Sequence, residues 1–461
     1  MLCLVAFAKA AISRWLCHQS SGMACIAQGH NDCAADDAGE RMKVMWRYMV
    51  EKSPPLHGIV EASISKNSVL PLMAASLLTD EEVVLSKAPR LQDVWAMSKL
   101  LSALGVEVGC QGEGLRLRCR QGRPMAAPLE LTRQLRASFI VLGPLAARFG
   151  EAFVPLPGGC GIGARPVDLH LKGLSQMGAE IASDHGGISC RGRLQGAHIY
   201  LDYPSVGCTE NLMMAASLAK GQTVLYNAAR EPEIVDLAGL LNAMGGRVTG
   251  AGSGTLCIEG QSRLSGAVYR PIPDRIEAGT YLYGAAVTRG DVRVNHISPQ
   301  HLQPVIAKLR LSGADVWEGP DWVRVRAAGR PRSVDLQTLP WPGFPTDMQS
   351  AAMVTACMAD GTSLITETVF ENRFMLVPEL VRMGASVRVQ GNTAVVEGIP
   401  WLKATQVEAP DLRAGAALVL AALGAEGVST IVDTGHICRG YEDLPGKLAA
   451  LGAPIEAIQQ A

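Results

Sequence analysis

Three stretches of this 461-residue chain combine charged side chains with expected helix starts or glycine loops, and each could bind an anion. The first is Ser65-Lys66-Asn67, which directly precedes a segment of small apolar residues with Pro71 near its start. A lysine at a helix N-terminus opposes the helix dipole unless an anion lies between the two. A bound anion is one interpretation, and a solvated lysine beside a turn-forming asparagine is the other.

The second stretch, residues 156–170, places Cys160 among four glycines, and Arg165 follows. This glycine content excludes a stable helix or strand interior, so we expect a mobile loop that carries a thiol and a guanidinium. A nearby arginine lowers the pKa of a thiol and favours thiolate. The glycine spacing fits neither a Walker loop nor a dinucleotide fingerprint. A Cys-His hydrolase that uses His170 and a surface loop with an incidental cysteine are the alternatives.

The third stretch is spread over the second half of the chain and is rich in arginine. Its motifs are PTDMQ with Asp347, FENRF with Arg373, DLR with Arg413 and HICRGY with Arg439. Guanidinium groups that converge on one point bind carboxylates and phosphates through paired hydrogen bonds. Each arginine alone would be an ordinary surface residue. Together with Lys66, Arg136 and Arg165, they predict a site for a small, multiply charged anion.

Composition limits the classes of protein that could carry these residues. Hydrophobic residues make up 48% and charged residues 18% of the chain, which is too apolar for disorder and too charged for a bundle of membrane spans. A formal net charge of −1 gives no reason to expect nucleic acid or an anionic membrane as partner. The twelve cysteines are scattered and form no CxxC pair, so we expect free thiols and a cytoplasmic location. The opening MLCLVAFAKAAISRW lacks a basic start, which leaves export as the weaker alternative.

A short sequence motif, which we call the recurring phrase, is repeated along the chain and indicates which elements position the charged residues. It consists of an apolar pair, a glycine, a small residue and the start of an apolar strand. Six copies, 67 to 73 residues apart, have their glycines at Gly105, Gly178, Gly245, Gly313, Gly384 and Gly452. Each predicts a helix that ends at a left-handed glycine and leads directly into a strand. A helix of small residues, a turn and another strand precede each copy, so the unit is βαβαββ.

Six such units exceed what one hydrophobic core usually holds, so we expect two lobes of three units each. The small side chains of the first helix in every unit predict tight helix packing in the lobe centres. A linear solenoid is the alternative, although solenoid repeats are usually about 20–45 residues long. The predicted anion site would lie between the lobes.

Six longer motifs follow one another along the chain: LPGGCGIGARPVDLHLKGL, NAAREPEIVDLA, PTDMQ, ETVFENRFMLVPELVRMGA, DLRA and HICRGYE. They resemble the signatures of the UDP-N-acetylglucosamine 1-carboxyvinyltransferase family of enolpyruvyl transferases, and the likeness runs from about Met45 to the C-terminus. The shikimate-pathway enolpyruvyl transferase is similar more distantly and lacks the cysteine loop. The resemblance implies an α/β (α+β) fold, a two-lobed inside-out α/β barrel. It implies a first lobe at 66–272 and a second lobe at 45–65 plus 273–461.

The resemblance also implies a reaction. The enolpyruvyl group of phosphoenolpyruvate would pass to the 3-hydroxyl of UDP-N-acetylglucosamine with release of phosphate, the first committed step of peptidoglycan synthesis. Asp347 would be the base at the sugar hydroxyl, and Cys160 the proton donor or product-release residue and the target of fosfomycin. Lys66 and Arg439 complete the implied catalytic set. No metal or organic cofactor is implied, and the oligomeric state stays open.

Substrate contacts are implied residue by residue. Those to phosphoenolpyruvate are Lys66, Asn67, Arg136, Arg165, Arg373, Arg413 and Arg439. Those to UDP-N-acetylglucosamine are Asn67, Arg133, Arg136, Arg165, Pro166, Val167, Asp168, Ser205, Val206, Gly207, Asp347 and Val369. Since these positions lie far apart in the sequence, closure of the two lobes around the substrates would assemble the site.

Three features depart from the family pattern. Cys438 stands where many members have an aspartate beside the arginine, so Arg439 would lose that ion pair. Tyr203-Pro204 replaces a lysine found in some members. Residues 1–44 match nothing, and we expect either a misplaced start, with initiation near Met42 or Met45, or a disordered extension.

Two alternatives to the implied function stay open. A paralogue that uses another nucleotide sugar or alcohol would change the sugar-side residues, and a silent regulatory paralogue would lose the aspartate base or the loop thiol. The chain retains both sets of residues.

Overall fold

A computed structural model of the chain describes residues 45–120, 126–156, 167–184 and 186–460. Cys160, Arg165 and Pro166 therefore lie outside the described residues. Within those ranges, none of the helices combines the length and apolar character needed to cross a membrane.

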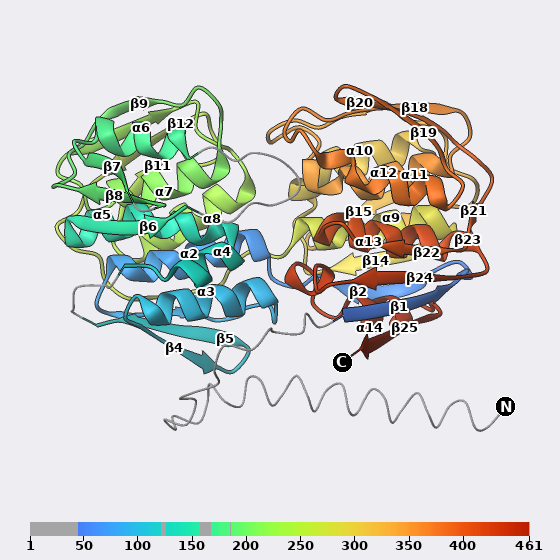
Figure 1. Cartoon of the computed structure of the whole chain (residues 1–461), viewed down its shortest axis with the longest axis horizontal. Coiled ribbons are helices and arrows are strands. Elements are labelled where there is room, and N and C mark those ends of the chain that lie inside the picture. Colours follow the sequence, from blue (N-terminus) through green and yellow to red (C-terminus); the bar gives the residue numbers. More distant parts are fainter. Residues whose placement is uncertain (1–44, 121–125, 157–166, 185, 461) are drawn as a thin grey trace.

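Two separate hydrophobic cores divide the described chain into two lobes that lie side by side (Figure 1). The core of the first, which we call lobe one, runs from Ile64 to Leu264. The core of the second, lobe two, contains residues 48–62 and 276–453. The described chain thus starts in lobe two at residue 45, forms lobe one and returns to lobe two.

Lobe one contains α2 (Lys66–Ala75), η1 (Ser76–Leu78), β3 (Glu82–Leu85), α3 (Gln92–Ala103), β4 (Val106–Gln111), β5 (Gly114–Cys119), α4 (Leu129–Gln134), η2 (Arg136–Val141), α5 (Leu142–Phe149), β6 (Glu151–Pro155), α6 (Asp168–Gln176), β7 (Glu180–Asp184), β8 (Gly187–Arg191), β9 (His198–Tyr200), α7 (Val206–Ala216), β10 (Gln222–Tyr226), α8 (Pro232–Ala243), β11 (Arg247–Thr249), β12 (Thr255–Glu259) and β13 (Ala267–Tyr269).

Lobe two contains β1 (Met45–Glu51), β2 (His57–Glu61), α9 (Arg275–Thr288), β14 (Asp291–Asn295), η3 (Pro299–Leu302), α10 (Gln303–Leu311), β15 (Asp315–Glu318), β16 (Trp322–Arg326), β17 (Leu336–Gln337), η4 (Thr346–Met348), α11 (Gln349–Cys357), β18 (Thr362–Thr366), η5 (Arg373–Leu376), α12 (Val377–Arg382), β19 (Ser386–Gln390), β20 (Thr393–Glu397), β21 (Leu402–Lys403), β22 (Gln406–Glu408), α13 (Leu412–Leu423), β23 (Ala425–Glu426), β24 (Val428–Asp433), η6 (Ile437–Arg439), α14 (Leu444–Ala450) and β25 (Ile455–Gln460).

The sheets repeat one pattern. The described residues form five four-stranded sheets, one three-stranded sheet and one two-stranded pair. In each four-stranded sheet, one parallel pair is extended by two antiparallel strands, as in β9-β10-β12-β11. Strands distant in sequence close each lobe, because β1 lies between β24 and β25, and β13 pairs with β3. The repeated pattern confirms the predicted α/β fold class.

The glycines of the recurring phrase have the predicted conformation. All six have φ between 87° and 95°, a region that other residues rarely adopt, and each lies between a helix and a strand. The small-residue helices also have the predicted position. Every residue of α9 and α11 is buried, as is all of α13 except its first residue, and these three helices contact one another in the centre of lobe two.

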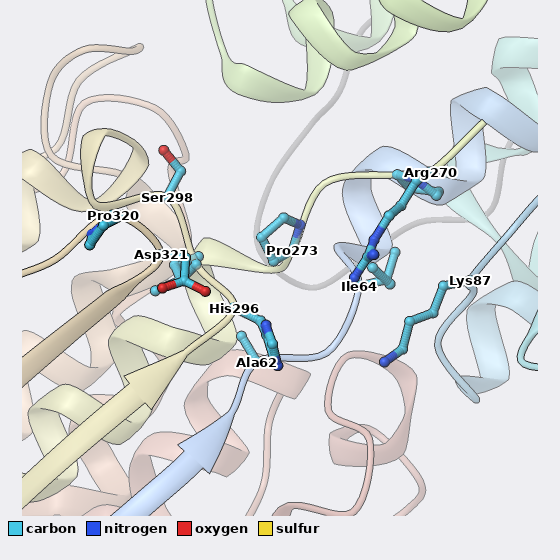
Figure 2. Close-up of a pocket in the computed structure, with 11 residues that line it drawn as sticks. Ala62, Ile64, Lys87, Arg270, Pro273, His296, Ser298, Pro320 and Asp321 are labelled. Carbon is cyan, nitrogen blue, oxygen red and sulfur yellow. The ribbon is translucent and has the colours of Figure 1, made fainter.

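Two segments, 62–65 and 270–274, connect the lobes and run next to each other. Ser65 N donates to Ile272 O over 2.9 Å, and an antiparallel bridge joins Ile64 to Pro273. A pocket of about 310 Å³ opens against these segments, with Lys87, Arg270 and His296 around it (Figure 2). It shares no lining residue with the ion clusters described next.

Candidate active site

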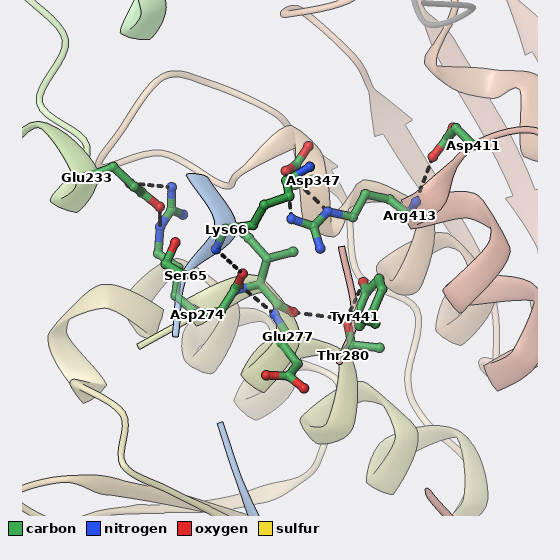
Figure 3. A network of polar contacts seen from close by, with 12 residues as sticks. Ser65, Lys66, Glu233, Asp274, Glu277, Thr280, Asp347, Asp411, Arg413 and Tyr441 are labelled. Atoms are coloured by element: carbon green, nitrogen blue, oxygen red, sulfur yellow. Dashed lines mark hydrogen bonds and ion pairs between the residues drawn. The ribbon is translucent and has the colours of Figure 1, made fainter. Parts of the chain in front are cut away.

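Asp347 lies at the centre of the first ion cluster. It belongs to η4, the turn that leads into the buried helix α11. Its Oδ1 is 2.9 Å from Arg373 Nη2, and its Oδ2 is 3.2 Å from Arg413 Nη2. Both arginine side chains are 2% exposed, whereas that of Asp347 is 26% exposed. Two buried guanidinium groups therefore hold a carboxylate that a ligand can still reach. Figure 3 shows the contact between Asp347 and Arg413.

Local structure fixes Arg413. Asp411 caps α13, since its side chain accepts from Arg413 N over 2.7 Å, and the Arg413 guanidinium lies 5.2 Å from the centre of the Tyr441 ring. Burial alone would lower the pKa of Arg413, but attraction by Tyr441 and Asp347 outweighs it and the pKa is raised. The arginine therefore stays charged.

Among the described residues, three buried guanidinium nitrogens of this cluster lack a hydrogen-bond acceptor. They are Arg373 Nε and, in Arg413, Nη1 and Nη2, of which Nη2 still forms the ion pair with Asp347. A buried donor left unpaired costs about 1–3 kcal/mol, and more when it is charged. An anionic ligand would supply the missing acceptors, so this arrangement favours an anion site.

A second ion cluster joins the two lobes. Asp93, at the start of α3 in lobe one, lies 3.2 Å from Lys66 Nζ and 2.8 Å from Arg439 Nε of lobe two. Burial raises the pKa of Asp93, but the attraction of Lys66 and Arg439 is stronger in sum, so the pKa lies below its ordinary value. The carboxylate is therefore ionised and holds two cations close together.

The two clusters meet at Asp274, the N-cap of α9. Its side chain accepts from Lys66 N over 3.3 Å, and from Ile276 N and Glu277 N (Figure 3). Its charge also contributes to the raised pKa of Arg413. Ser65 caps α2 next to Lys66, where its hydroxyl accepts from Ser68 N. Lys66 thus lies at the start of a helix as predicted, and the carboxylate of Asp93 balances its charge.

The structure brings together five of the predicted residues, Lys66 and Arg439 around Asp93, and Arg373 and Arg413 around Asp347. The others are placed by element. Asn67 is the second residue of α2, Arg133 lies in α4, Arg136 begins η2, Val167 caps α6, Asp168 begins α6, Ser205 caps α7, Val206 and Gly207 begin α7, and Val369 lies between β18 and η5. Within the described part of the chain, no ion pair joins Arg133 or Asp168 to either cluster.

His170 has a structural setting. Its Nδ1 is 2.9 Å from Asn211 Nδ2, its ring packs edge-on against Phe139, and burial lowers its pKa to about 4. It is therefore neutral near pH 7 and held inside lobe one. These contacts give no support to the alternative of a Cys-His hydrolase.

Cys438 does not replace the acidic partner that the family pattern has beside Arg439. Its Sγ donates to Gly435 O over 3.3 Å, and burial raises its pKa to about 12, so the thiol is neutral. Arg439 nonetheless has a carboxylate partner in Asp93, which comes from the other lobe.

Asp93 and Glu233 are among the charged residues of the lobe boundary that sequence reasoning missed. Glu233 binds Arg275 of lobe two through two contacts of 3.1 and 3.3 Å, and both residues are buried. Next to this pair, Trp341 N donates to Glu231 Oε1 over 3.3 Å. An acidic residue in the first turn of a helix is ordinary, because it suits the helix dipole. A single sequence therefore contained no signal for either.

Comparison with solved structures assigns the fold to a class. The enolpyruvyl transferase NikO from Streptomyces tendae aligns with a TM-score of 0.81 at 24% identity, covering 91% of this chain and 100% of that one. An EPSP synthase from Acinetobacter baumannii aligns with a TM-score of 0.70 at 17% identity over 90% of this chain. The fold is therefore that of the enolpyruvyl transferases.

Sequence comparison places the chain within this class. The family model described as EPSP synthase (3-phosphoshikimate 1-carboxyvinyltransferase) matches residues 50–448, and the chain belongs to this family. It is 50% identical over 419 residues to a UDP-N-acetylglucosamine 1-carboxyvinyltransferase of Shewanella sp. (strain W3-18-1), covering 90% of this chain and 100% of that protein. A UDP-N-acetylglucosamine 1-carboxyvinyltransferase 1 of Caldanaerobacter subterraneus is 50% identical over 411 residues, covering 89% and 99%.

Proposed function

We propose that this protein transfers the enolpyruvyl group of phosphoenolpyruvate to the 3-hydroxyl of UDP-N-acetylglucosamine and releases phosphate, in peptidoglycan synthesis. The observation that carries the proposal is the carboxylate of Asp347, which is held by buried Arg373 and Arg413 yet remains 26% exposed. The 50% identity to relatives that are named for this reaction supports the choice of acceptor.

In this proposal, Asp347 removes the proton from the 3-hydroxyl of the sugar, and the oxygen of that hydroxyl attacks C2 of phosphoenolpyruvate. The methylene carbon C3 takes up a proton, with Cys160 as the proposed donor, and a tetrahedral intermediate forms. Loss of a proton from C3 then restores the double bond as the C2–O bond to phosphate breaks. Atoms and charges balance, so the transfer requires no oxidant or reductant.

The positively charged side chains of the two ion clusters suit the negative charge that develops in the reaction. Lys66 and Arg439 are proposed to bind the phosphoryl group, with Arg136 and Arg165, while Arg373 and Arg413 offer unpaired donors to negative charge near Asp347. Positive charge from side chains held in place before the reaction stabilises the transition state without further reorganisation. Asn67, Arg133 and the starts of α6 and α7 are proposed to contact the nucleotide sugar.

The cellular setting follows from the same proposal. Both substrates are cytoplasmic metabolites, so we place the protein in the cytoplasm, where its product would supply cell-wall synthesis and hence cell shape and division. Cys160 is the proposed target of fosfomycin. The two lobes would close over the bound sugar nucleotide and bring the loop of Cys160 to the reacting carbon.

Phosphate release from phosphoenolpyruvate, measured with and without UDP-N-acetylglucosamine, tests the proposal. We expect release that depends on the sugar nucleotide, and a loss of about 100-fold or more in Asp347→Asn, because an amide cannot accept the proton. Arg324→Gln, which alters an exposed ion pair with Asp291, is the matched control and should keep full activity. Release that depends on shikimate 3-phosphate, or none with either acceptor from folded protein, would overturn the assignment.

A further inference from the structure

A buried carboxylate outside both ion clusters holds the residue next to Asp347. Glu367 directly follows β18 and is 2% exposed. Its Oε2 accepts from Thr346 Oγ1 over 2.9 Å. Its Oε1 accepts from Thr338 Oγ1 (2.8 Å), Val369 N (2.8 Å) and Phe370 N (3.2 Å). Four hydrogen bonds thus use both oxygens of one buried side chain.

These bonds join the two segments that carry Asp347 and Arg373. Thr346 begins η4 and immediately precedes Asp347, while residues 369–370 lead into η5, which begins at Arg373. The side chain of Arg373 in turn donates a hydrogen bond of 2.9 Å to Asp347, so the two segments are joined a second time. Asp347 is therefore fixed twice, through its backbone by way of Glu367 and through its side chain by Arg373.

We propose that Glu367 is a positioning residue that sets the direction from which the Asp347 carboxylate reaches the acceptor hydroxyl. This role rests on the proposed function. Glu367 is buried, and among its hydrogen bonds those from Thr346 and from the backbone of residues 369–370 link it to the segments that carry Asp347 and Arg373. Aspartate has a short side chain, and a small rotation of its turn displaces the carboxylate. A displacement of about 1 Å in an active site can reduce the rate by about 100-fold.

The bond from Thr346 can be removed without emptying the site. Thr346→Val keeps the shape of the side chain but lacks the hydroxyl, and it leaves the other three bonds of Glu367 in place. Thr346→Ser lacks only the methyl group and keeps the donor. We expect kcat for sugar-dependent phosphate release to fall about 10- to 100-fold in Thr346→Val and to stay within about threefold of the wild type in Thr346→Ser.

A matched control separates positioning from general weakening of lobe two. Thr346 is half-buried and Thr288 is buried in lobe two. The Thr288 Oγ1 accepts from Leu56 N over 3.2 Å and donates to Gly284 O over 2.8 Å, and among the described residues it has no hydrogen bond to either ion cluster. Thr288→Val should lower Tm to a similar extent as Thr346→Val while kcat is kept. KM for both substrates should change by less than about threefold in either variant, because Thr346 orients the base and does not bind the substrate.

The outcomes are distinct. A wild-type protein without sugar-dependent phosphate release overturns the proposed function and this role with it. An active wild type with full kcat in Thr346→Val overturns the positioning role alone. Equal losses of kcat in Thr346→Val and Thr288→Val, or in Thr346→Val and Thr346→Ser, also overturn it. If Thr346→Val does not fold, Thr346→Ala takes its place in the same comparison.

Discussion

The carboxylate of Asp93 allows a sharp test, because it forms ion pairs with both Lys66 and Arg439. Replacing it in Asp93→Asn keeps the size of the side chain and removes its charge. Lys66 is 8% exposed and the side chain of Arg439 is 30% exposed, so neither cation is fully solvated. The variant therefore removes the carboxylate that pairs with both of these partly buried positive charges.

The expected loss of stability follows from this geometry. Removing one partner of a buried ion pair costs about 3–5 kcal/mol. The amide oxygen of asparagine can still accept a hydrogen bond, so we expect Asp93→Asn to lie at the low end of this range, at about 3 kcal/mol. The pKa of Asp93 in the folded protein lies below its ordinary value of 3.8. The carboxylate therefore contributes its full share to the free energy of unfolding above the pKa of the unfolded state, and this share is lost as the pH falls through the pKa of the folded state. The difference between wild type and variant should be full at pH 7 and shrink below about pH 4.

Denaturant unfolding of both proteins at pH 7 and at about pH 3, below the unfolded pKa of the aspartate, measures this difference. The control is Asp291→Asn, which removes the ion pair between Asp291 and Arg324. The side chain of Asp291 is 19% exposed and that of Arg324 is 46% exposed, so the loss should lower the free energy of unfolding by less than about 1 kcal/mol. Inorganic phosphate should stabilise Asp93→Asn more than wild type, because the dianion can replace the missing carboxylate. Equal stability of Asp93→Asn and wild type at pH 7, or a difference that grows on acidification, would refute the reasoning.

Three further predictions address the site, the loop and the fold. Arg413→Lys should lower the rate of sugar-dependent phosphate release by about 10- to 100-fold, since lysine cannot contact both the carboxylate of Asp347 and a substrate anion; unchanged kcat/KM would contradict it. Cys160→Asp should abolish inactivation by fosfomycin, and an active wild type that fosfomycin leaves unaffected would remove the proposed role of the thiol. Gly260→Ala should destabilise the protein by about 1–3 kcal/mol, because a Cβ would lie 1.7 Å from Ala219 O; a thermal midpoint equal to that of wild type would count against the packing.

The elements of the repeat could be predicted because their signals are local. Gly245, for example, has φ of 88° because a helix ends there and a strand follows directly. The residues on either side of the glycine are enough to predict this conformation. Small residues in a segment such as 412–423 likewise indicate a central helix, since only small side chains let helices approach closely. These features depend on neighbours in the sequence.

The partners across the site could not be predicted, because they depend on how distant segments meet. Asp93 and Arg439 are 346 residues apart, and their contact exists only where η6 of lobe two touches α3 of lobe one. Glu367 belongs to a motif that the sequence shows clearly, yet nothing local reveals that its carboxylate is buried with four donors. The resemblance implied candidate residues for the chemistry, whereas the structure shows which residues hold several of these candidates in place.

The repeat also explains why the charged residues meet. Lys66, Asp274 and Arg413 lie at the starts of three of the central helices, α2, α9 and α13, and Asp347 lies in the turn before a fourth, α11. Contacts join these starts in pairs, Lys66 N to Asp274 and Arg413 to Asp347, while the charge of Asp274 raises the pKa of Arg413. Helix starts carry partial positive charge, so they reinforce anion binding by the side chains there. Because each unit presents an equivalent helix start, a different residue in each copy can equip one shared site without altering the fold.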